Sequence, residues 1–352
     1  MSGPLGVPAH RRAPLEALLA ALDPLAHIVL STHVNADGDG AGSEAAIACW
    51  LTRLGKRVHI ANPTPFPGLY LHLLEDEQLL RDPAHPDAAR TVREADALLV
   101  LDTAEPRRIG RIASAAAGKP VLVMDHHVAA DTGFEGVLVQ DASACATGEL
   151  VYDLLSMAGF ARPWPEAAVN GIYTALVTDT GSFRFANTTR RAHELAGDLI
   201  EQGADPEREY RRIFATVPLR RIQLLRHALQ NLEVDGRYPL TWISVEREVM
   251  DELGATVEDL EGLVEHARSI EGTEVALLFR PTSDGATKVS FRSAGDVDVN
   301  ALARQFGGGG HVKASGAVVP EPMPRARERV LDAARAALSA RGLDFRTVRD
   351  PG

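Results

Sequence analysis

Five short apolar runs in the first 140 residues constrain the fold of this chain more than any other feature. Stretches of helical length, such as 41–54 and 107–117, lie between most of these runs. Strands that are apolar on both faces and alternate with helices form parallel sheets with helices on both sides. The sequence therefore predicts an α/β domain on a parallel sheet, with further helices at 146–159 and 165–178. The runs are "AHIVLST" (26–32), "RVHIAN" (57–62), "ALLVLD" (97–102), "PVLVMD" (120–125) and "GVLVQ" (136–140).

The composition changes after residue 204. An Arg-rich helical stretch at 205–233 follows, and Pro218 should kink it. Beyond it we expect a second, smaller α/β domain. Its predicted strands are 239–246, 274–282, 286–293 and 312–319, and its predicted helices are 256–269, 298–305 and 323–341. The predicted organisation is a larger α/β domain at 1–204, a helical linker at 205–235 and a smaller α/β domain at 236–352.

Composition narrows the function classes. A chain of 352 residues with 45% hydrophobic content can bury a core in each of two domains. Its apolar stretches are too short for a membrane helix and residues 1–22 lack a convincing signal-peptide core, so we expect a cytoplasmic protein without a membrane partner. Cys49 and Cys145 lie in apolar or small-residue segments, which predicts buried free thiols and excludes zinc–thiolate chemistry. A net charge of −11 disfavours binding to long nucleic acids and leaves short anionic substrates.

Acidic and imidazole side chains follow the ends of three predicted strands. The first strand runs into the Gly-rich turn "THVNADGDGAGSE", and the others end at Asp102 and at "DHH". Because ligands bind beyond the carboxyl ends of parallel strands, we expect these groups at one edge of the sheet. A fourth acidic segment, "ALVTDTGSF", ends another mostly apolar stretch. The candidate residues are His33, Asp37, Asp39, Asp102, Asp125, His126, His127 and Asp179.

This set of side chains is suited to hard metal ions. Carboxylates and imidazoles without thiolates favour Mn²⁺, Mg²⁺ or Fe²⁺, and crowded carboxylates are costly unless cations neutralise them. Two ions roughly 3.5–4 Å apart could share one carboxylate, activate a water and clamp the oxygens of a phosphoester. Each segment alone has a simpler interpretation, as a solvated turn or a helix cap. Together, at the same end of apolar elements, they favour a metal site.

Other polar residues are assigned to structure. His27, His59 and His72 are isolated in the sequence and are expected to be surface or packing residues. Thr147 and Glu149 are expected to begin a helix rather than to catalyse.

The motifs "HVNADGDGAGS", "VLDTAE", "VMDHH", "VTDTGSF" and "GGGGHVKASGA" resemble the successive motifs of the DHH/DHHA1 phosphoesterases. The compact two-domain form is similar to the NrnA-type oligoribonucleases and 3′-phosphoadenosine 5′-phosphate (pAp) phosphatases. The resemblance extends over residues 26–320. One departure is Ala36, where the family often has Pro before the first Asp of the motif.

The resemblance implies two divalent metal ions, with Mn²⁺ preferred over Mg²⁺ or another ion. His33, Asp37 and Asp102 would hold one ion, and Asp102 would bridge to the second. His127 would face the substrate phosphate and could stabilise charge or donate a proton to the leaving oxygen. Asp125 would orient its neighbours or act as a weak ligand. The ligands implied for the second ion are Asp39, Asp102, His126 and Asp179.

The resemblance also implies that the smaller domain holds a terminal nucleotide, with the active site in the cleft between the domains. The glycine run alone would indicate a turn, because it lacks the Lys-Ser/Thr ending of a P-loop. Arg292 is the candidate phosphate clamp, since a guanidinium can bind phosphate with two hydrogen bonds. The other candidate substrate residues are Arg184, Ser293, Asn300, Gly308, Gly309, Gly310 and His311.

The implied activity is exonucleolytic release of 5′-mononucleotides from short single-stranded RNA or DNA. The alternatives are a pAp phosphatase, a phosphodiesterase for linear dinucleotides such as pApA or pGpG, an inorganic pyrophosphatase, and a nucleotide-sensing module without catalysis. Cleavage polarity, the preference for RNA or DNA, the length cut-off and the formation of a homodimer are left open by the sequence.

Overall fold

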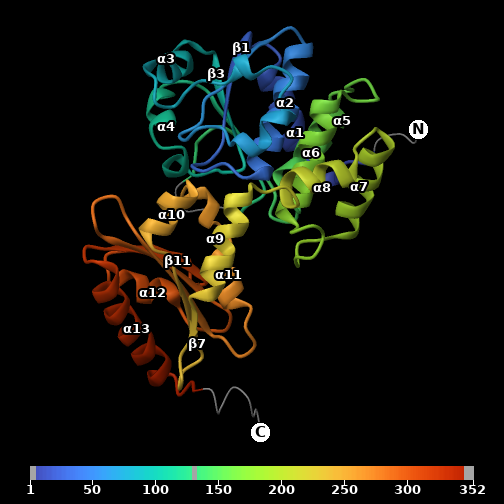
Figure 1. Ribbon diagram of the computed structural model, residues 1–352. Coiled ribbons are helices and arrows are strands. Elements are labelled where there is room, and N and C mark those ends of the chain that lie inside the picture. The colour runs from blue at the N-terminus through green and yellow to red at the C-terminus, as the bar shows by residue number, and fades with distance from the viewer. Residues whose placement is uncertain (1–4, 129–132, 345–352) are drawn as a thin grey trace. The chain divides into compact units, whose positions relative to one another are not determined.

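The computed structural model describes residues 5–128 and 133–344, and the chain divides into two compact units between residues 216 and 217 (Figure 1). The division lies between helix α8 (Pro206–Phe214) and helix α9 (Leu219–Gln230). The prediction of one helix kinked at Pro218 is wrong. Pro218 lies in extended conformation and precedes α9, because its ring disfavours a helical conformation for the residue before it. Within the described residues, no helix is long and apolar enough to cross a membrane.

The first unit is built on a five-stranded sheet in which every neighbouring pair of strands is parallel, as predicted. β1 and β3 are buried along their whole length, which explains why both strands are continuously apolar. The strands, in their order across the sheet, are β2 (Arg57–Ile60), β1 (His27–Ser31), β3 (Ala97–Leu101), β4 (Val121–Asp125) and β5 (Val137–Gln140).

Helices cover both faces of this sheet. Ile28 and Leu30 of β1 pack into a core with α1, α2, α5 and α6, whereas Val29 faces the opposite core beneath α3 and α4. Figure 1 shows α3 and α4 on one side of β1 and β3, and α1 and α2 on the other. The predicted helix at 107–117 is interrupted at Gly110, which has a φ of 51°. The helices of this unit are α1 (Ala9–Leu22), α2 (Gly38–Arg53), α3 (Pro86–Glu94), α4 (Arg111–Ala115), α5 (Thr147–Met157), α6 (Glu166–Asp179), α7 (Arg190–Glu201) and α8, with 3₁₀ turns η1 (Gly68–Leu73), η2 (Glu77–Leu79) and η3 (Pro106–Ile109).

Two buried features of the first unit bear on the sequence predictions. Cys49 and Cys145 are free and buried, as expected. Arg11 of α1 is also buried, and its guanidinium bonds to the carboxylates of Asp141 (2.6 Å), Glu149 (2.6 Å) and Asp153 (2.9 Å). Glu149 therefore belongs to the packing between α1 and α5 and has a structural role.

The second unit is a smaller α/β fold on a mixed six-stranded sheet, in which only β7 and β8 pair in parallel among the described strands. Its four longer strands agree with the predictions, whereas β6 and β10 are too short to produce a recognisable apolar pattern. The strands, in their order across the sheet, are β10 (Gly309–Gly310), β11 (Ala314–Val319), β9 (Thr287–Ser293), β8 (Val275–Pro281), β7 (Leu240–Ser244) and β6 (Leu232–Val234).

Helices α12 (Val299–Arg304) and α13 (Met323–Ala340) pack on one face of the second sheet. Residues of α9, α10 (Arg247–Leu253), α11 (Leu263–Arg268) and the 3₁₀ turn η4 (Glu258–Leu260) pack on the other. The single helix predicted at 256–269 is wrong. Gly262 has a φ of 80°, which ends η4 and starts α11 as a separate helix.

Candidate metal centre

The predicted ligand residues lie together beyond the carboxyl ends of β1, β3 and β4. Among the described residues there are three groups of acidic and imidazole side chains, and within each group the ligand atoms lie within 4.8 Å of one another. Asp102 belongs to two of these groups and His126 to two. The groups are His33, Asp37 and Asp102; Asp39, His126 and Asp179; and Asp102, His126 and His127.

The two imidazoles face different oxygens of the same carboxylate. Nε2 of His33 is 3.3 Å from Oδ2 of Asp102, and Nε2 of His126 is 3.6 Å from its Oδ1. His33 also lies 3.7 Å from Asp37, whereas His126 lies 3.6 Å from both Asp39 and Asp179. Asp102 therefore occupies the position that a bridging carboxylate between two cations requires.

Both imidazoles can offer a lone pair on Nε2 to a cation when the ring is neutral. Nδ1 of His33 is 3.0 Å from the carbonyl oxygen of Val34, and Nδ1 of His126 is 3.4 Å from that of Ala144. A carbonyl can only accept, so Nδ1 carries the proton and a neutral ring has its lone pair on Nε2. Nε2 of His126 is buried and has no hydrogen-bond partner among the described residues. Burying a nitrogen without a hydrogen-bond partner is energetically unfavourable, and a bound cation would satisfy its lone pair.

The backbone at Asp102 is strained in a way that serves the site. Its φ is 63°, which is uncommon for a residue other than glycine and is characteristic of functional positions. The amide of Asp102 donates to the carbonyl of Met124 (2.9 Å), and its Oδ1 accepts from the hydroxyl of Thr147 (3.0 Å). Contacts with β4 and α5 thus hold the carboxylate in place.

Two helix N-termini position the acidic turn after β1. Asp37 caps α2, because its Oδ1 accepts from the amides of Asp39 (3.0 Å) and Gly40 (3.2 Å). The carboxylate of Asp39 accepts from the amides of Thr147 (2.6 Å) and Gly148 (2.9 Å), which open α5. A carboxylate at a helix N-terminus is favoured by the helix dipole. Thr147 does begin α5, as expected, but the sequence did not reveal its contacts with Asp39 and Asp102.

The pKa values show an excess of negative charge. Burial, followed by the charges of Asp102, Asp179 and Asp37, raises the pKa of Asp39 well above its ordinary value. The pKa of Asp179 is raised to about 6, chiefly by burial. Burial lowers the pKa of His33, but its bonds to Asp102 and Asp37 outweigh this effect and raise the pKa to about 10. Divalent cations would supply the positive charge that the crowded carboxylates otherwise obtain from protons.

Asp125 and His127 form a pair beside the ligands. Nδ1 of His127 donates to Oδ1 of Asp125 at 2.7 Å, and this bond raises the pKa of His127. Burial would raise the pKa of Asp125, but the bonds from His127 reverse this and lower it. The ring of His127 is 45% exposed, so a substrate can reach it.

Hydrogen bonds from Glu44 through Asn62 to the backbone of Thr32 support the end of β1. The sequence analysis did not identify Glu44 or Asn62. Burial raises the pKa of the fully buried Glu44 to about 8, and Glu44 accepts from Nδ2 of Asn62 at 2.9 Å. Oδ1 of Asn62 accepts from the amide of Thr32 at 2.9 Å. The signal that could have identified Glu44 is a lone acid in the apolar helix sequence "GSEAAIACW".

The candidate substrate residues lie in both units. In the first unit, Arg184 is exposed and its Nε donates to the carbonyl of Gly181 within its own turn (2.6 Å). In the second unit, Arg292 and Ser293 end β9, and Gly309 and Gly310 form β10; β11 pairs with both strands.

The remaining second-unit candidates have distinct environments. Nε of Arg292 donates to Glu265 at 2.9 Å, and Oγ of Ser293 donates to the carbonyl of Gly295 at 3.0 Å. Oδ1 of Asn300 is buried without a hydrogen-bond partner among the described residues, and His311 is exposed. Gly308 lies against β11, since a Cβ there would be 2.2 Å from the carbonyl oxygen of Gly316.

Comparisons with known proteins agree with this geometry. Residues 27–177 match the DHH family N-terminal domain, and residues 243–340 match the DHHA1 domain. The chain is 32% identical to the bifunctional oligoribonuclease and PAP phosphatase NrnA of Thermus thermophilus, over 90% of this chain and 91% of that protein. This chain belongs to the DHH/DHHA1 phosphoesterase family. As a member of that family, it is a hydrolase of phosphoester bonds.

A second relative and two solved structures are also similar to this chain. The NrnA protein of Bacillus subtilis is 30% identical, over 83% of this chain and 89% of that protein. The crystal structure of an exopolyphosphatase-related protein from Bacteroides fragilis superposes with a TM-score of 0.84 at 25% identity, over 96% of this chain and 98% of that one. The exonuclease RecJ bound to manganese shares the fold, with a TM-score of 0.50 at 18% identity over 94% of this chain and 97% of that one.

Proposed function

We propose that this chain is an exonuclease that releases 5′-mononucleotides from short single-stranded RNA or DNA with two divalent cations, Mn²⁺ being preferred and Mg²⁺ the alternative. The observation that carries the proposal is the carboxylate of Asp102. Its two oxygens face His33 and His126, and each imidazole has at least one further carboxylate beside it. The relatives named as oligoribonucleases support the choice of substrate.

In this proposal His33, Asp37 and Asp102 hold one cation. Bound there, the two cations would polarise the phosphoryl oxygens and lower the pKa of an attacking water. The charge that they bring would also offset the burial and the repulsion that together raise the pKa of Asp39 and Asp179. The second cation would be held by Asp39, Asp102, His126 and Asp179.

His127 is proposed to supply a proton. Asp125 accepts the Nδ1 proton of His127 and favours the charged imidazole, so Nε2 can also carry a proton. A half-exposed N–H can donate to a phosphoryl oxygen or to the leaving oxygen of the substrate. Asp125 acts through His127 by fixing its orientation.

The second unit is proposed to bind the terminal nucleotide and so to restrict cleavage to chain ends. Arg292 would bind a phosphate after giving up its hydrogen bond to Glu265. Asn300 could satisfy its buried Oδ1 with a donor from the ligand. Ser293, Gly308, Gly309, Gly310 and His311 would complete this site, and Arg184 is proposed as a further phosphate contact from the first unit.

Phosphatase activity on 3′-phosphoadenosine 5′-phosphate is the second candidate function. Both NrnA relatives carry the name of a bifunctional oligoribonuclease and PAP phosphatase, and the same metal centre could serve either phosphoester.

The test of the metal centre is Asp102→Asn. Asparagine tolerates a positive φ and can keep the bond from Thr147. Loss of one shared ligand should reduce kcat by at least about 100- to 1,000-fold, the equivalent of several kcal/mol of transition-state stabilisation. Purified protein with Mn²⁺ would be offered labelled RNA dimers to pentamers, a 24-mer, pAp and pyrophosphate. Turnover by Asp102→Asn at the wild-type rate would refute the assignment, and turnover of pyrophosphate alone would refute the substrate class.

The test of the second unit is Arg292→Ala. Because Arg292 is proposed to bind a phosphate of the substrate, KM should rise about tenfold or more while kcat changes little. The matched control is Arg268→Ala, which removes another arginine that pairs with Glu265. An unchanged KM in Arg292→Ala would exclude its role as a clamp.

A further inference from the structure

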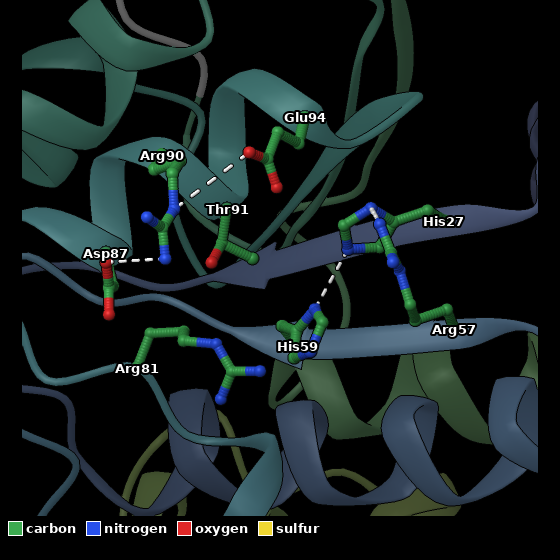
Figure 2. A pocket seen from close by; sticks show the side chains of 8 residues that line it. All are labelled: His27, Arg57, His59, Arg81, Asp87, Arg90, Thr91 and Glu94. Atoms are coloured by element: carbon green, nitrogen blue, oxygen red, sulfur yellow. Dashed lines mark hydrogen bonds and ion pairs between the residues drawn. The ribbon is translucent and has the colours of Figure 1, made fainter.

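A pocket of about 430 Å³ lies on the α3 face of the first unit's sheet (Figure 2). His27 and His59 project from β1 and β2 on the same face as Val29 and Ala61, which pack beneath α3. His27 opens β1, whereas the metal ligands follow its end at Ser31, about 13 Å of strand away. The pocket is therefore separate from the metal centre. It is lined by His27, Arg57, His59, Arg81, Asp87, Arg90, Thr91 and Glu94.

Three side chains along the strands form a directed chain of hydrogen bonds. Nη2 of Arg57 lies 2.6 Å from Nδ1 of His27, and a guanidinium can only donate, so Nδ1 of His27 accepts. A neutral His27 then carries its proton on Nε2, which lies 2.9 Å from Nδ1 of His59 and donates to it. A neutral His59 must in turn carry its proton on Nε2. This N–H has no hydrogen-bond partner among the described residues.

Figure 2 shows where this series of hydrogen bonds ends. His59 lies between the imidazole of His27 and the guanidinium of Arg81 (Figure 2). The two imidazole rings meet edge to face, with centroids 5.0 Å apart. This side of the pocket is thus lined with N–H donors.

The charges of the pocket are unequally paired. Arg90 of α3 takes both carboxylates, with Asp87 at 2.7 Å and Glu94 at 3.9 Å. Arg57 and Arg81 have no carboxylate partner among the described residues. Arg81 donates through Nη1 to backbone carbonyls only, those of Gln78 (2.7 Å) and Leu80 (2.8 Å). The lining therefore has three guanidinium groups against two carboxylates, and the two that have no ion-pair partner among the described residues are Arg57 and Arg81, although the charge of Asp87 also acts on Arg81.

This excess of positive charge acts on the imidazoles. Burial, followed by the charges of Arg81, His27 and Arg57, lowers the pKa of His59 to about 4. Burial and then Arg57 also lower the pKa of His27, although Glu94 and Asp96 oppose this effect. Both rings are neutral near pH 7, as the chain of hydrogen bonds requires.

We propose that this pocket binds a phosphate dianion, free or as the phosphomonoester of a small molecule, between Arg57, Arg81 and Nε2 of His59. Guanidinium groups bind phosphate oxygens with charge-assisted hydrogen bonds, and the neutral imidazole adds a further donor. The volume exceeds that of phosphate alone and lies within the range of small-molecule sites, roughly 300–1,000 Å³. Asp87 and Glu94 on the opposite wall would repel an extended polyanion, which favours a single phosphoryl group over RNA. This inference does not depend on the proposed exonuclease activity.

The test is calorimetric titration of the full-length protein in EDTA with inorganic phosphate and, separately, with adenosine 5′-monophosphate. EDTA removes cations that could hold phosphate at the metal centre. Each probe should bind the wild type and Asp102→Asn with the same Kd. The Kd for the double variant Arg57→Gln/Arg81→Gln should be at least about tenfold higher. Arg81→Gln alone serves if the double variant does not fold. The matched control is Arg93→Gln, which removes an exposed arginine of α3 that does not line the pocket.

The outcomes separate the two sources of the dianion. Equal affinity for both probes would show that the pocket recognises the phosphoryl group alone. Tighter binding of the nucleotide would show that the pocket recognises a phosphomonoester. Binding that persists unchanged in both Arg81→Gln and the double variant, or the absence of binding to the wild type, would overturn the proposal.

Discussion

Replacement of Asp179 by asparagine should stabilise the metal-free protein. In the group that Asp179 forms with Asp39 and His126, all ligand atoms lie within 4.8 Å of one another. The charged carboxylates of Asp39 and Asp179 at that distance would repel each other by about 3 kcal/mol at an effective dielectric constant near 20. The raised pKa of Asp179 corresponds to a similar energy. A rise from 3.8 to about 6 corresponds to about 3 kcal/mol, at about 1.4 kcal/mol per pH unit. Because the side chain is 28% exposed, water reduces the effect to between about 1 and 3 kcal/mol.

The sign of the effect depends on pH. The folded carboxyl binds its proton more tightly than the unfolded one, so its favourable contribution is complete below pH 3.8 and is lost as the pH rises through about 6. At pH 8 the metal-free wild type therefore carries the full penalty, which Asp179→Asn removes. We expect the variant to unfold about 2–12 °C higher at pH 8, since the melting temperature of a folded unit of about 200 residues shifts by roughly 2–4 °C per kcal/mol. At pH 5 the difference should shrink.

A bound cation should reverse the ranking. Asp179 would then act as a ligand, so Mn²⁺ should raise the melting temperature of the wild type more than that of Asp179→Asn. The assay is thermal unfolding followed by circular dichroism, in EDTA and in Mn²⁺, at pH 5 and pH 8. Glu16→Gln on the exposed face of α1 is the control for loss of one negative charge. The reasoning fails if Asp179→Asn is no more stable than wild type in EDTA at pH 8, or if both gain equally from Mn²⁺.

Two further predictions concern the framework that holds the site. Gly42→Ala would place a Cβ 2.2 Å from the carbonyl oxygen of Gly171, forcing α2 and α6 apart, and should lower the free energy of unfolding by about 2 kcal/mol or more. The control is Gly197→Ala in an exposed turn of α7, where an added Cβ would meet nothing within 4 Å; it should raise the free energy of unfolding by up to about 1 kcal/mol. Equal changes in the free energy of unfolding for the two variants, measured by urea denaturation, would contradict the close packing of α2 against α6. Glu44→Gln should abolish the loss of stability that metal-free wild type shows as the pH rises through about 8, because burial raises the pKa of Glu44 to about 8 in the folded state. Parallel stability profiles of the two proteins between pH 7 and pH 9 would show that Glu44 does not titrate there.

The positions of the metal-centre residues could be predicted because one topological rule applies to them. Continuously apolar strands indicate a parallel sheet, and such a sheet collects the residues after its strands at one edge. Asp102 and His126 follow that rule directly. The amides of Thr147 and Gly148 do not, because they reach Asp39 across more than 100 residues of sequence. Their contribution depends on how α5 packs against α2, which no local pattern encodes.

The histidines of the first unit show the same limit. His27 and His59 were each expected to be isolated surface or packing residues. The register of β1 and β2 places His27 opposite Arg57 and Val29 opposite His59, so the rings meet diagonally across the strand pair. Register depends on the packing of both faces of the sheet and cannot be deduced from either strand alone.

The two sites of the first unit are opposite in chemistry, and this difference follows from their partners rather than from net charge. Around Asp102 the side chains are mainly acceptors, and Nε2 of His126 has no hydrogen-bond partner among the described residues. Around Arg81 they are mainly donors, and in the same described part of the chain the N–H of His59 has no acceptor. A net charge of −11 averages over both and describes neither. What each site binds is determined by groups whose hydrogen-bonding capacity the fold leaves unused, so a cation is expected at one and a dianion at the other.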